Sequence, residues 1–141
     1  NMDLSENEID ESIYDAMLLS VDVAHALHPN KKEKMDITNM PVMGKGFCIK
    51  QACSQSYATD AQAIASLCQL CDEKGIPYQR FVNRSDSRGG STLGSIAGTL
   101  LPVKTVDIGI PILAMHSACE LMGVRDMKAL SDCVTAFFGY H

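Results

Sequence analysis

Hydrophobic and polar residues alternate along this chain with two spacings, one helical and one typical of strands. Ser5 and Glu8 have the spacing of a capping box, and apolar residues then recur at helical intervals. Gly75 and Pro77 are typical of the end of a second helix. Helices are predicted over residues 6–18, from Thr59 or Asp60 to about Lys74, from a Gly-rich turn to about Leu101, and from about Arg125 to Phe138.

Four short apolar runs predict strands. They cover residues 18–28, 47–51, 78–83 and 105–110. The first run, from Leu18 to His28, is expected to be a buried strand that carries polar groups at its C-terminal end. Open sheets of α/β proteins place their chemistry at that end. Strands that alternate with helices indicate an α/β domain, a three-layer sandwich with helices flanking a sheet.

Composition narrows the class of protein. A chain of 141 residues can form one domain with its own core. The formal net charge of −5 argues against nucleic acid as a partner, because its phosphates require clustered Lys and Arg. The chain has no apolar run near the roughly 20 residues that span a bilayer. Its acidic N-terminus also differs from a secretory signal. A cytoplasmic protein without nucleic-acid or membrane partners is expected.

The six cysteines do not suggest a disulfide framework, because the chain is neither short nor loop-dominated. Cys68 and Cys71 form a C-x-x-C pair in the middle of a predicted helix. Zinc ribbons need a second pair, and thioredoxin-like sites need a strand-to-helix turn. Reduced, partly buried structural thiols are the favoured interpretation, and a metal or redox role is the alternative.

Candidate chemistry is concentrated in the first predicted strand. Asp22, His25 and His28 lie within seven residues of an otherwise apolar segment. Buried ionisable groups are costly unless they are paired or bound to a metal. The residues alone leave two interpretations open: a metal or catalytic site, or hydrogen-bonded polar groups of the core. His116 has the same two interpretations, and a core histidine is the commoner one.

Two further features have both a structural and a functional interpretation. Lys50 is unusual in a short apolar strand. It either lies on an edge strand with its amine in solvent, or provides a fixed positive charge for an anionic substrate group. The stretch from Gly89 to Gly94 lacks the lysine of a P-loop, so a tight turn with close backbone packing is favoured. Its N–H groups could still hold an anion.

Taken together, these motifs resemble the aspartyl aminopeptidases. The stretch Ser20-Val-Asp-Val-Ala-His-Ala-Leu-His-Pro-Asn is similar to that family's S-x-D-x-A-H-A-x-H-P-N block. Ile49-Lys50, Tyr57-Ala58, Asp86 with the Gly-Gly-Ser-Thr-Leu-Gly turn, and the block from Asp107 to Ala-Met-His-Ser follow in the family's order and spacing. The resemblance covers nearly the whole chain from about residue 10 onward.

The resemblance implies a zinc-peptidase-like domain with a mixed sheet flanked by helices. Two zinc ions, or manganese or cobalt in their place, would activate a bridging water. Asp22 and His116 would each be a metal ligand, and His25 would contact the substrate near the metals. Lys50 would face the side chain of an N-terminal Asp or Glu, and Tyr57 would line the same pocket. Peptides with an acidic N-terminus are the implied substrates, and self-association is implied by the family's dodecamers.

The family's other metal ligands and its general base lie upstream of the matched motifs and have no counterpart in this chain. Residues 1–141 are therefore expected to be the C-terminal portion of the catalytic domain, without its N-terminal half and inserted domain. The chain would contain no catalytic residue and would be inactive alone. One alternative is a non-catalytic interaction or assembly module. Another is a one-metal binding protein that uses Asp22, His25, His28 and His116.

Overall fold

The computed structural model describes residues 4–58, 60–87 and 89–139. Its helices are α1 (Glu6–Asp15), α2 (Ala61–Lys74), α3 (Leu93–Leu100) and α4 (Val124–Phe138), with a 3-10 turn at Lys32–Lys34. Its strands are β1 (Met17–His25), β2 (Phe47–Gln51), β3 (Tyr78–Val82), β4 (Lys104–Leu113) and β5 (Leu121–Met122). Thr59, one of the two predicted start points of α2, lies outside the described residues. Asp60 is the N-cap, and its side chain accepts a hydrogen bond from the Ala63 amide at 2.8 Å.

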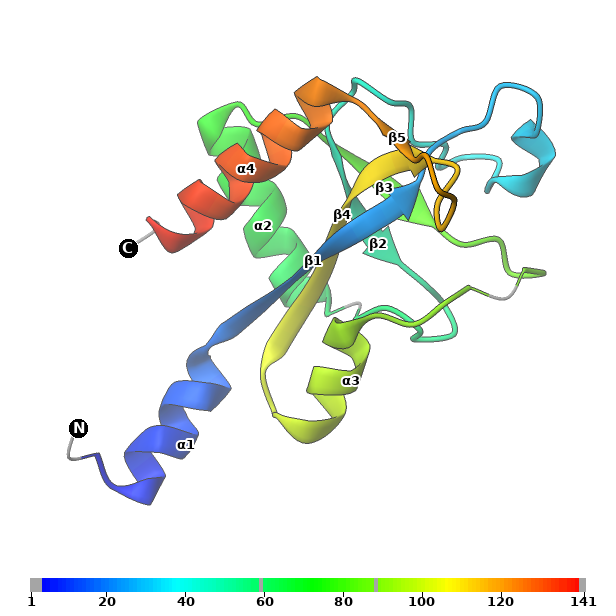
Figure 1. Ribbon diagram of the computed structural model, residues 1–141. Helices are drawn as coiled ribbons and strands as arrows, with labels where there is room; N and C mark the ends of the chain where they lie inside the picture. Colours follow the sequence, from blue (N-terminus) through cyan, green and yellow to red (C-terminus); the bar gives the residue numbers. More distant parts are fainter. Residues whose placement is uncertain (1–3, 59, 88, 140–141) are drawn as a thin grey trace.

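The strands form one mixed sheet in the order β1-β4-β2-β3, with β5 paired to β4. The pairs β1–β4 and β2–β3 are parallel, whereas β2 and β4 are antiparallel. Figure 1 shows β1 and β4 side by side through the middle of the molecule. The predicted α/β class with a mixed sheet and flanking helices is confirmed.

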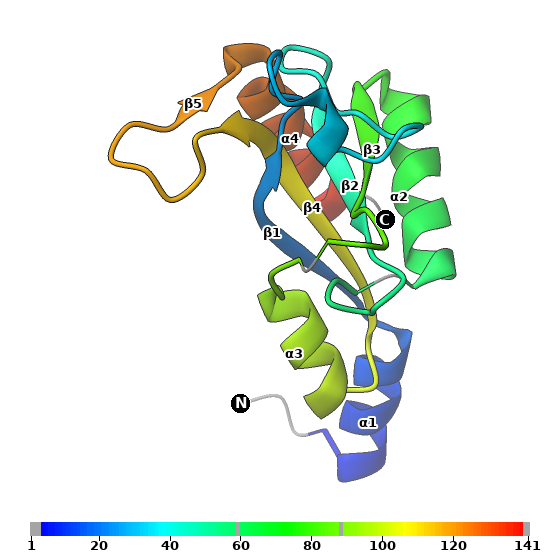
Figure 2. The same cartoon turned by 90° about the vertical axis from the view of Figure 1, so that its right-hand side faces the viewer.

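The two faces of the sheet are covered differently. Helices α2 and α4 pack on one face, and α3 lies against β1 and β4 on the other (Figure 2). Alternate residues of β4, from Val106 to Ile112, meet Leu67 of α2 and Leu130 of α4 in the main core. The opposite face has a smaller cluster of buried residues, made by Ala24, Met35, Cys48, Ala52, Tyr57 and Phe81.

Strand β1 differs from the prediction in its burial. The expected strand is present, but Val21 is 48% exposed and Leu18, Leu19 and Val23 are only half-buried. The reason is that β1 is the last strand of the described sheet and pairs only with β4. Apolar composition identified the strand but could not show that it lies at an edge.

Three element boundaries also differ from the prediction. Strand β1 ends at His25 rather than at His28. Helix α1 ends at Asp15 rather than near residue 18, because Met17 enters the sheet opposite Lys104. Strand β4 continues beyond residue 110 to Leu113, through Pro111. The described pairing of β4 with β2 covers only residues 107–109, so Pro111 interrupts no hydrogen bond of that ladder. None of the described helices combines the length and the apolar character needed to cross a bilayer.

Candidate functional site

Three neighbouring strands bring polar side chains together on the face opposite α2 and α4. Asp107 of β4 is in register with Lys50 of β2, and Gly109 of β4 is in register with Asp22 of β1. A Cβ atom at Gly109 would lie 3.0 Å from Asp22 Oδ1. The absence of a side chain at Gly109 therefore lets Asp22 reach across β4 toward Lys50.

Lys50 and Asp22 form an ion pair at the centre of this group. Lys50 Nζ donates to Asp22 Oδ1 at 2.6 Å, to Oδ2 at 2.9 Å and to the Val23 carbonyl at 3.1 Å. Lys50 is only 3% exposed and β2 is an interior strand, so the edge-strand interpretation is wrong. The Asp22 side chain keeps 40% of its surface exposed. Partial burial raises the pKa of Asp22, opposed by the hydrogen bond and charge of Lys50.

Tyr57 provides one wall around the ammonium group. Its ring centroid lies 4.4 Å from Lys50 Nζ, and the ring also packs near Phe81, with 6.2 Å between centroids. A cation over an aromatic face is attracted by the ring, more strongly where water is excluded. Tyr57 is 7% exposed, and its burial raises the pKa of the phenol. The two residues predicted to share a pocket, Lys50 and Tyr57, are thus in contact.

His25 lies at the C-terminal end of β1, beyond Asp22. Its ring centroid is 6.5 Å from that of Phe81. Partial burial lowers the pKa of His25, and the charges of His116 and Lys50 lower it further. The imidazole is therefore held in its neutral form near pH 7. His28 is not directed at the same group, because its Nδ1 accepts a hydrogen bond from the Asn30 amide at 3.1 Å.

His116 lies in the exposed loop between β4 and β5, which projects from the sheet (Figure 2). Its backbone has a φ of 68°, a left-handed conformation that is uncommon for residues other than glycine. The backbone N–H donates to Glu120 Oε1 at 2.6 Å. The interpretation of His116 as a core histidine is wrong. Its exposed side chain can instead take part in binding.

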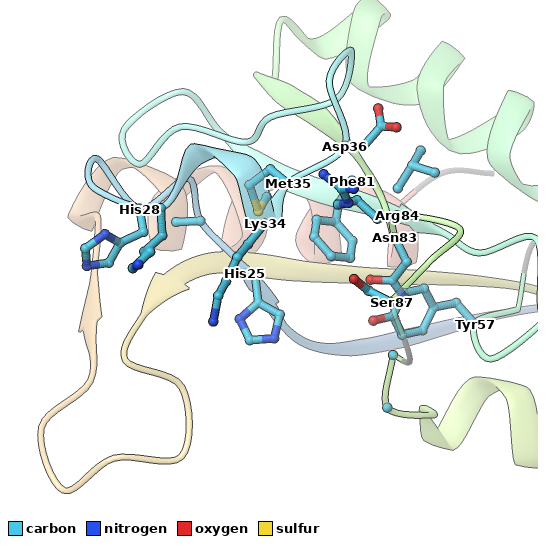
Figure 3. Close-up of a pocket in the computed structure, with 15 residues that line it drawn as sticks. His25, His28, Lys34, Met35, Asp36, Tyr57, Phe81, Asn83, Arg84 and Ser87 are labelled. Atoms are coloured by element: carbon cyan, nitrogen blue, oxygen red, sulfur yellow. The ribbon is translucent and has the colours of Figure 1, made fainter.

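A cavity of about 480 Å³ opens beside this group and is shown in Figure 3. Tyr57 and Phe81 provide its aromatic part, and His25 joins it to the end of β1. Arg84 also lines the cavity and forms an ion pair with Asp86 at 2.6 Å. The pair is local and exposed, and Arg84 also donates to the Glu33 carbonyl.

The described residues do not by themselves form a zinc site. In residues 4–58, 60–87 and 89–139, no three His, Cys, Asp or Glu side chains are close enough to hold a metal ion. Structural zinc sites use four protein ligands and catalytic sites use three. The structure therefore does not assemble Asp22, His25, His28 and His116 into a one-metal site. Asp22 and His116 could contribute single ligands to a site completed from elsewhere.

Sequence reasoning named Asp107 within a motif but gave it no role. It is 0% exposed, and its Oδ2 accepts hydrogen bonds from the Ala58 amide at 2.6 Å and from Thr92 Oγ1 at 2.7 Å. The Thr92 amide in turn donates to the Ser56 carbonyl at 3.3 Å. The available signal was a single carboxylate inside the apolar run from Val106 to Ile112.

Comparison with known proteins decides the family. A family model described as "Aminopeptidase I zinc metalloprotease (M18)" matches residues 2–138. The chain belongs to the M18 family. The resemblance drawn from the motifs is confirmed, and the family's description names zinc as its metal.

Individual M18 relatives agree with this assignment. A "Probable M18 family aminopeptidase 2" of Clostridium novyi is 53% identical over 111 residues, which are 79% of this chain and 26% of the relative. The structure of an Ape4 and Nbr1 complex matches with a TM-score of 0.92 and 34% identity, over 95% of this chain and 26% of that one. The mApe1 dodecamer of S. cerevisiae matches with a TM-score of 0.80 and 26% identity, over 90% and 27% of the two chains. The chain thus spans about a quarter of the length of these relatives.

Proposed function

We propose that this chain is the C-terminal portion of the catalytic domain of a metal-dependent aminopeptidase that removes acidic residues from peptide N-termini. Family membership and the names of the relatives support the reaction class. The observation that supports a preference for acidic residues is the burial of the Lys50 ammonium group beside the partly exposed carboxylate of Asp22. The general base and the remaining ligands would lie in the part of the longer protein that precedes this chain. The isolated chain would then be inactive.

Asp22 and His116 are the metal ligands that we assign to this chain. A carboxylate oxygen and an imidazole nitrogen are both zinc ligands, and both side chains are accessible. Zinc is the metal named for the family, and two ions per active site, with manganese or cobalt as substitutes, are part of the proposal. The remaining ligands would come from outside the described residues.

Lys50 would recognise the acidic side chain of the substrate when Asp22 binds a metal, because the ammonium group that donates to Asp22 in this structure could then donate to a substrate carboxylate. The rings of Tyr57 and Phe81 exclude water from its surroundings, and in such an environment a cation attracts a carboxylate more strongly than in solvent. His25, held neutral, can offer one donor and one acceptor to the substrate without adding charge. The pocket would therefore favour Asp or Glu over an apolar side chain.

Replacing Lys50 tests this specificity. In the full-length protein, Lys50→Met should lower kcat/KM for an aspartyl chromogenic substrate by about 100-fold, the scale expected when a buried charge loses its partner. Hydrolysis of a leucyl substrate should fall far less. The control is Lys128→Met, which removes an exposed lysine paired with Asp132 on α4 and should leave both rates unchanged.

Two results of this comparison would contradict the proposal. Equal losses for both substrates in Lys50→Met would exclude Lys50 as the origin of acidic preference. A wild-type full-length protein that hydrolyses neither substrate in the presence of zinc, manganese or cobalt would exclude the aminopeptidase reaction itself.

The second candidate is a non-catalytic assembly module. It is favoured by the lack of a three-ligand group in the described residues and by the structural relative solved as a dodecamer. Under this function the chain self-associates but hydrolyses nothing, even when it is part of the full-length protein. Turnover by the isolated chain that disappears in Asp22→Ala would exclude this candidate and would also show that the chain is active alone.

A further inference from the structure

We propose that Asp107 and Thr92 form a bracket that holds Tyr57 against Lys50, which makes Asp107 a positioning residue for the substrate side-chain pocket. Asp107 does not touch the proposed substrate but acts through Tyr57. The inference rests on the proposed function, because it assigns a structural support to the pocket that would recognise the acidic residue.

The bracket consists of three hydrogen bonds that enclose Tyr57. Asp107 Oδ2 accepts from the Ala58 amide at 2.6 Å, and so fixes the peptide group that follows Tyr57. The Thr92 amide donates to the Ser56 carbonyl at 3.3 Å, and so fixes the residue that precedes it. Thr92 Oγ1 donates to the same Asp107 oxygen at 2.7 Å and closes the bracket. The backbone of Tyr57 is thereby held from both sides.

The loop that carries Tyr57 needs such support. Strand β2 ends at Gln51 and α2 begins at Ala61, so Tyr57 lies in a segment outside any helix or strand. Within this segment Gln55 has a φ of 56°, a strained conformation for a residue other than glycine. Residues 53–55 are exposed and provide no packing. Packing on Phe81 holds the Tyr57 ring itself, and the hydrogen bonds of the bracket tie the backbone around it to the sheet.

We infer that Asp107 is needed for the hydrogen bonds that its carboxylate accepts, and not for the volume that its side chain fills. Its second oxygen, Oδ1, has no hydrogen-bond partner among the described residues. An apolar side chain of similar size would fill the same volume without the cost of dehydrating a carboxylate. What a carboxylate adds is an acceptor for Ala58 and Thr92. Gly94 allows the start of α3 to come this close, because a Cβ there would lie 2.8 Å from Asp107 Oδ1.

The bracket affects the pocket through the position of the Tyr57 ring. Its ring lies 4.4 Å from Lys50 Nζ and forms a wall of the adjoining cavity. A displaced ring would open the ammonium group to water and weaken its attraction for a substrate carboxylate. Loss of the bracket should therefore affect acidic substrates more than neutral ones, and substrate binding more than turnover.

Matched substitutions in the full-length protein test the bracket. Thr92→Val keeps the shape of the side chain but removes the donor to Asp107, whereas Thr92→Ser keeps the hydroxyl. Thr92→Val should raise KM for an aspartyl substrate about tenfold with little change in kcat, because the hydrogen bond to the charged acceptor is lost. The longer N-cap bond that Thr92 Oγ1 accepts from the Ser95 amide at 3.4 Å is lost as well, and Thr92→Ser keeps both. Thr92→Ser should restore the wild-type KM. Asp107→Ala should resemble Thr92→Val, and Asp107→Asn, which keeps an acceptor oxygen, should be milder.

Asp126→Asn is the control for a general loss of stability. Asp126 is also 0% exposed and accepts two backbone hydrogen bonds, from Gly44 at 2.7 Å and Gly46 at 2.8 Å, but it lies at the opposite end of β2. This variant should lower the thermal midpoint without changing the preference for aspartyl over leucyl substrates. If it changes the preference as much as Thr92→Val does, or if Thr92→Val leaves KM unchanged, the bracket has no positioning role.

Amide hydrogen exchange tests the bracket independently of the proposed function. The Ala58 amide should exchange faster in Thr92→Val than in Thr92→Ser, whatever the enzyme's substrate preference. If the wild-type protein shows no acidic preference, the proposed specificity fails, and faster exchange at Ala58 still upholds the bracket. Unchanged exchange in both Thr92→Val and Asp107→Ala overturns it.

Discussion

Each charged residue buried in the described part of the chain is bonded to a segment distant in the sequence. Lys50 bonds Asp22 across 28 residues, and Asp107 bonds the Ala58 amide across 49. Asp126 at the start of α4 bonds the amides of Gly44 and Gly46 across about 80. A charge removed from water must recover its hydrogen bonds inside the protein. The contacts of Asp107 and Asp126 therefore fasten loops, whereas that of Lys50 links strands β1 and β2.

Among single residues, Gly46 and Gly44 provide a matched pair for a stability prediction. Both have positive φ angles, +104° and +86°, but a Cβ at Gly46 would lie 2.1 Å from the Pro77 carbonyl oxygen, whereas at Gly44 it would meet nothing within 4 Å. Gly44→Ala should cost about 1 kcal/mol for backbone strain alone. Gly46→Ala should cost roughly 3 kcal/mol or more, because the backbone must also move. Urea unfolding of both variants checks this, and equal losses would show that the contact with Pro77 is not tight.

Among the elements, local signals predicted most of the secondary structure. The N-cap at Asp60 and the left-handed Gly75, with a φ of 65°, are properties of a few neighbouring residues and could be read from the sequence. The exposure of β1 could not, because it depends on which strand lies beside it. The contact between Asp22 and Lys50 depends in the same way on the order β1-β4-β2. Sequence motifs named both residues but not their pairing.

Helix α1 is the element on which the structure makes the clearest stability prediction. It extends away from the sheet (Figure 1) and contributes no buried residue. Leu67 of α2 is only 1% exposed and lies in the main core. Leu67→Ala should cost about 2–5 kcal/mol, whereas removal of residues 1–15 should cost less than about 1 kcal/mol. Thermal unfolding of the three proteins compares them. A larger loss from the truncation would mean that α1 packs on the domain in solution.

At the scale of the whole molecule, this chain leaves an edge and an apolar surface uncovered. Within the described sheet, the outer edge of β1 has no strand beside it. On the site face, Leu93 and Leu100 of α3 are 81% and 77% exposed. The relatives are about four times longer than the matched part, so in a longer protein other segments are available to cover both features. The sequence showed which motifs are missing, but only the strand order shows that β1, like β3 at the other end of the described sheet, has an unpaired edge.

These uncovered features predict that the 141-residue chain alone self-associates. An unpaired strand edge offers a row of free N–H and C=O groups to another copy, and a lysine on such an edge discourages the pairing. Val21→Lys on β1 should therefore shift the chain toward monomer in sedimentation velocity at tens of micromolar. Gln69→Lys, which adds the same charge on the exposed side of α2, should leave the distribution unchanged. A wild-type chain that is monomeric at every concentration would contradict the prediction. An equal effect of both substitutions would mean that net charge, rather than the β1 edge, controls association.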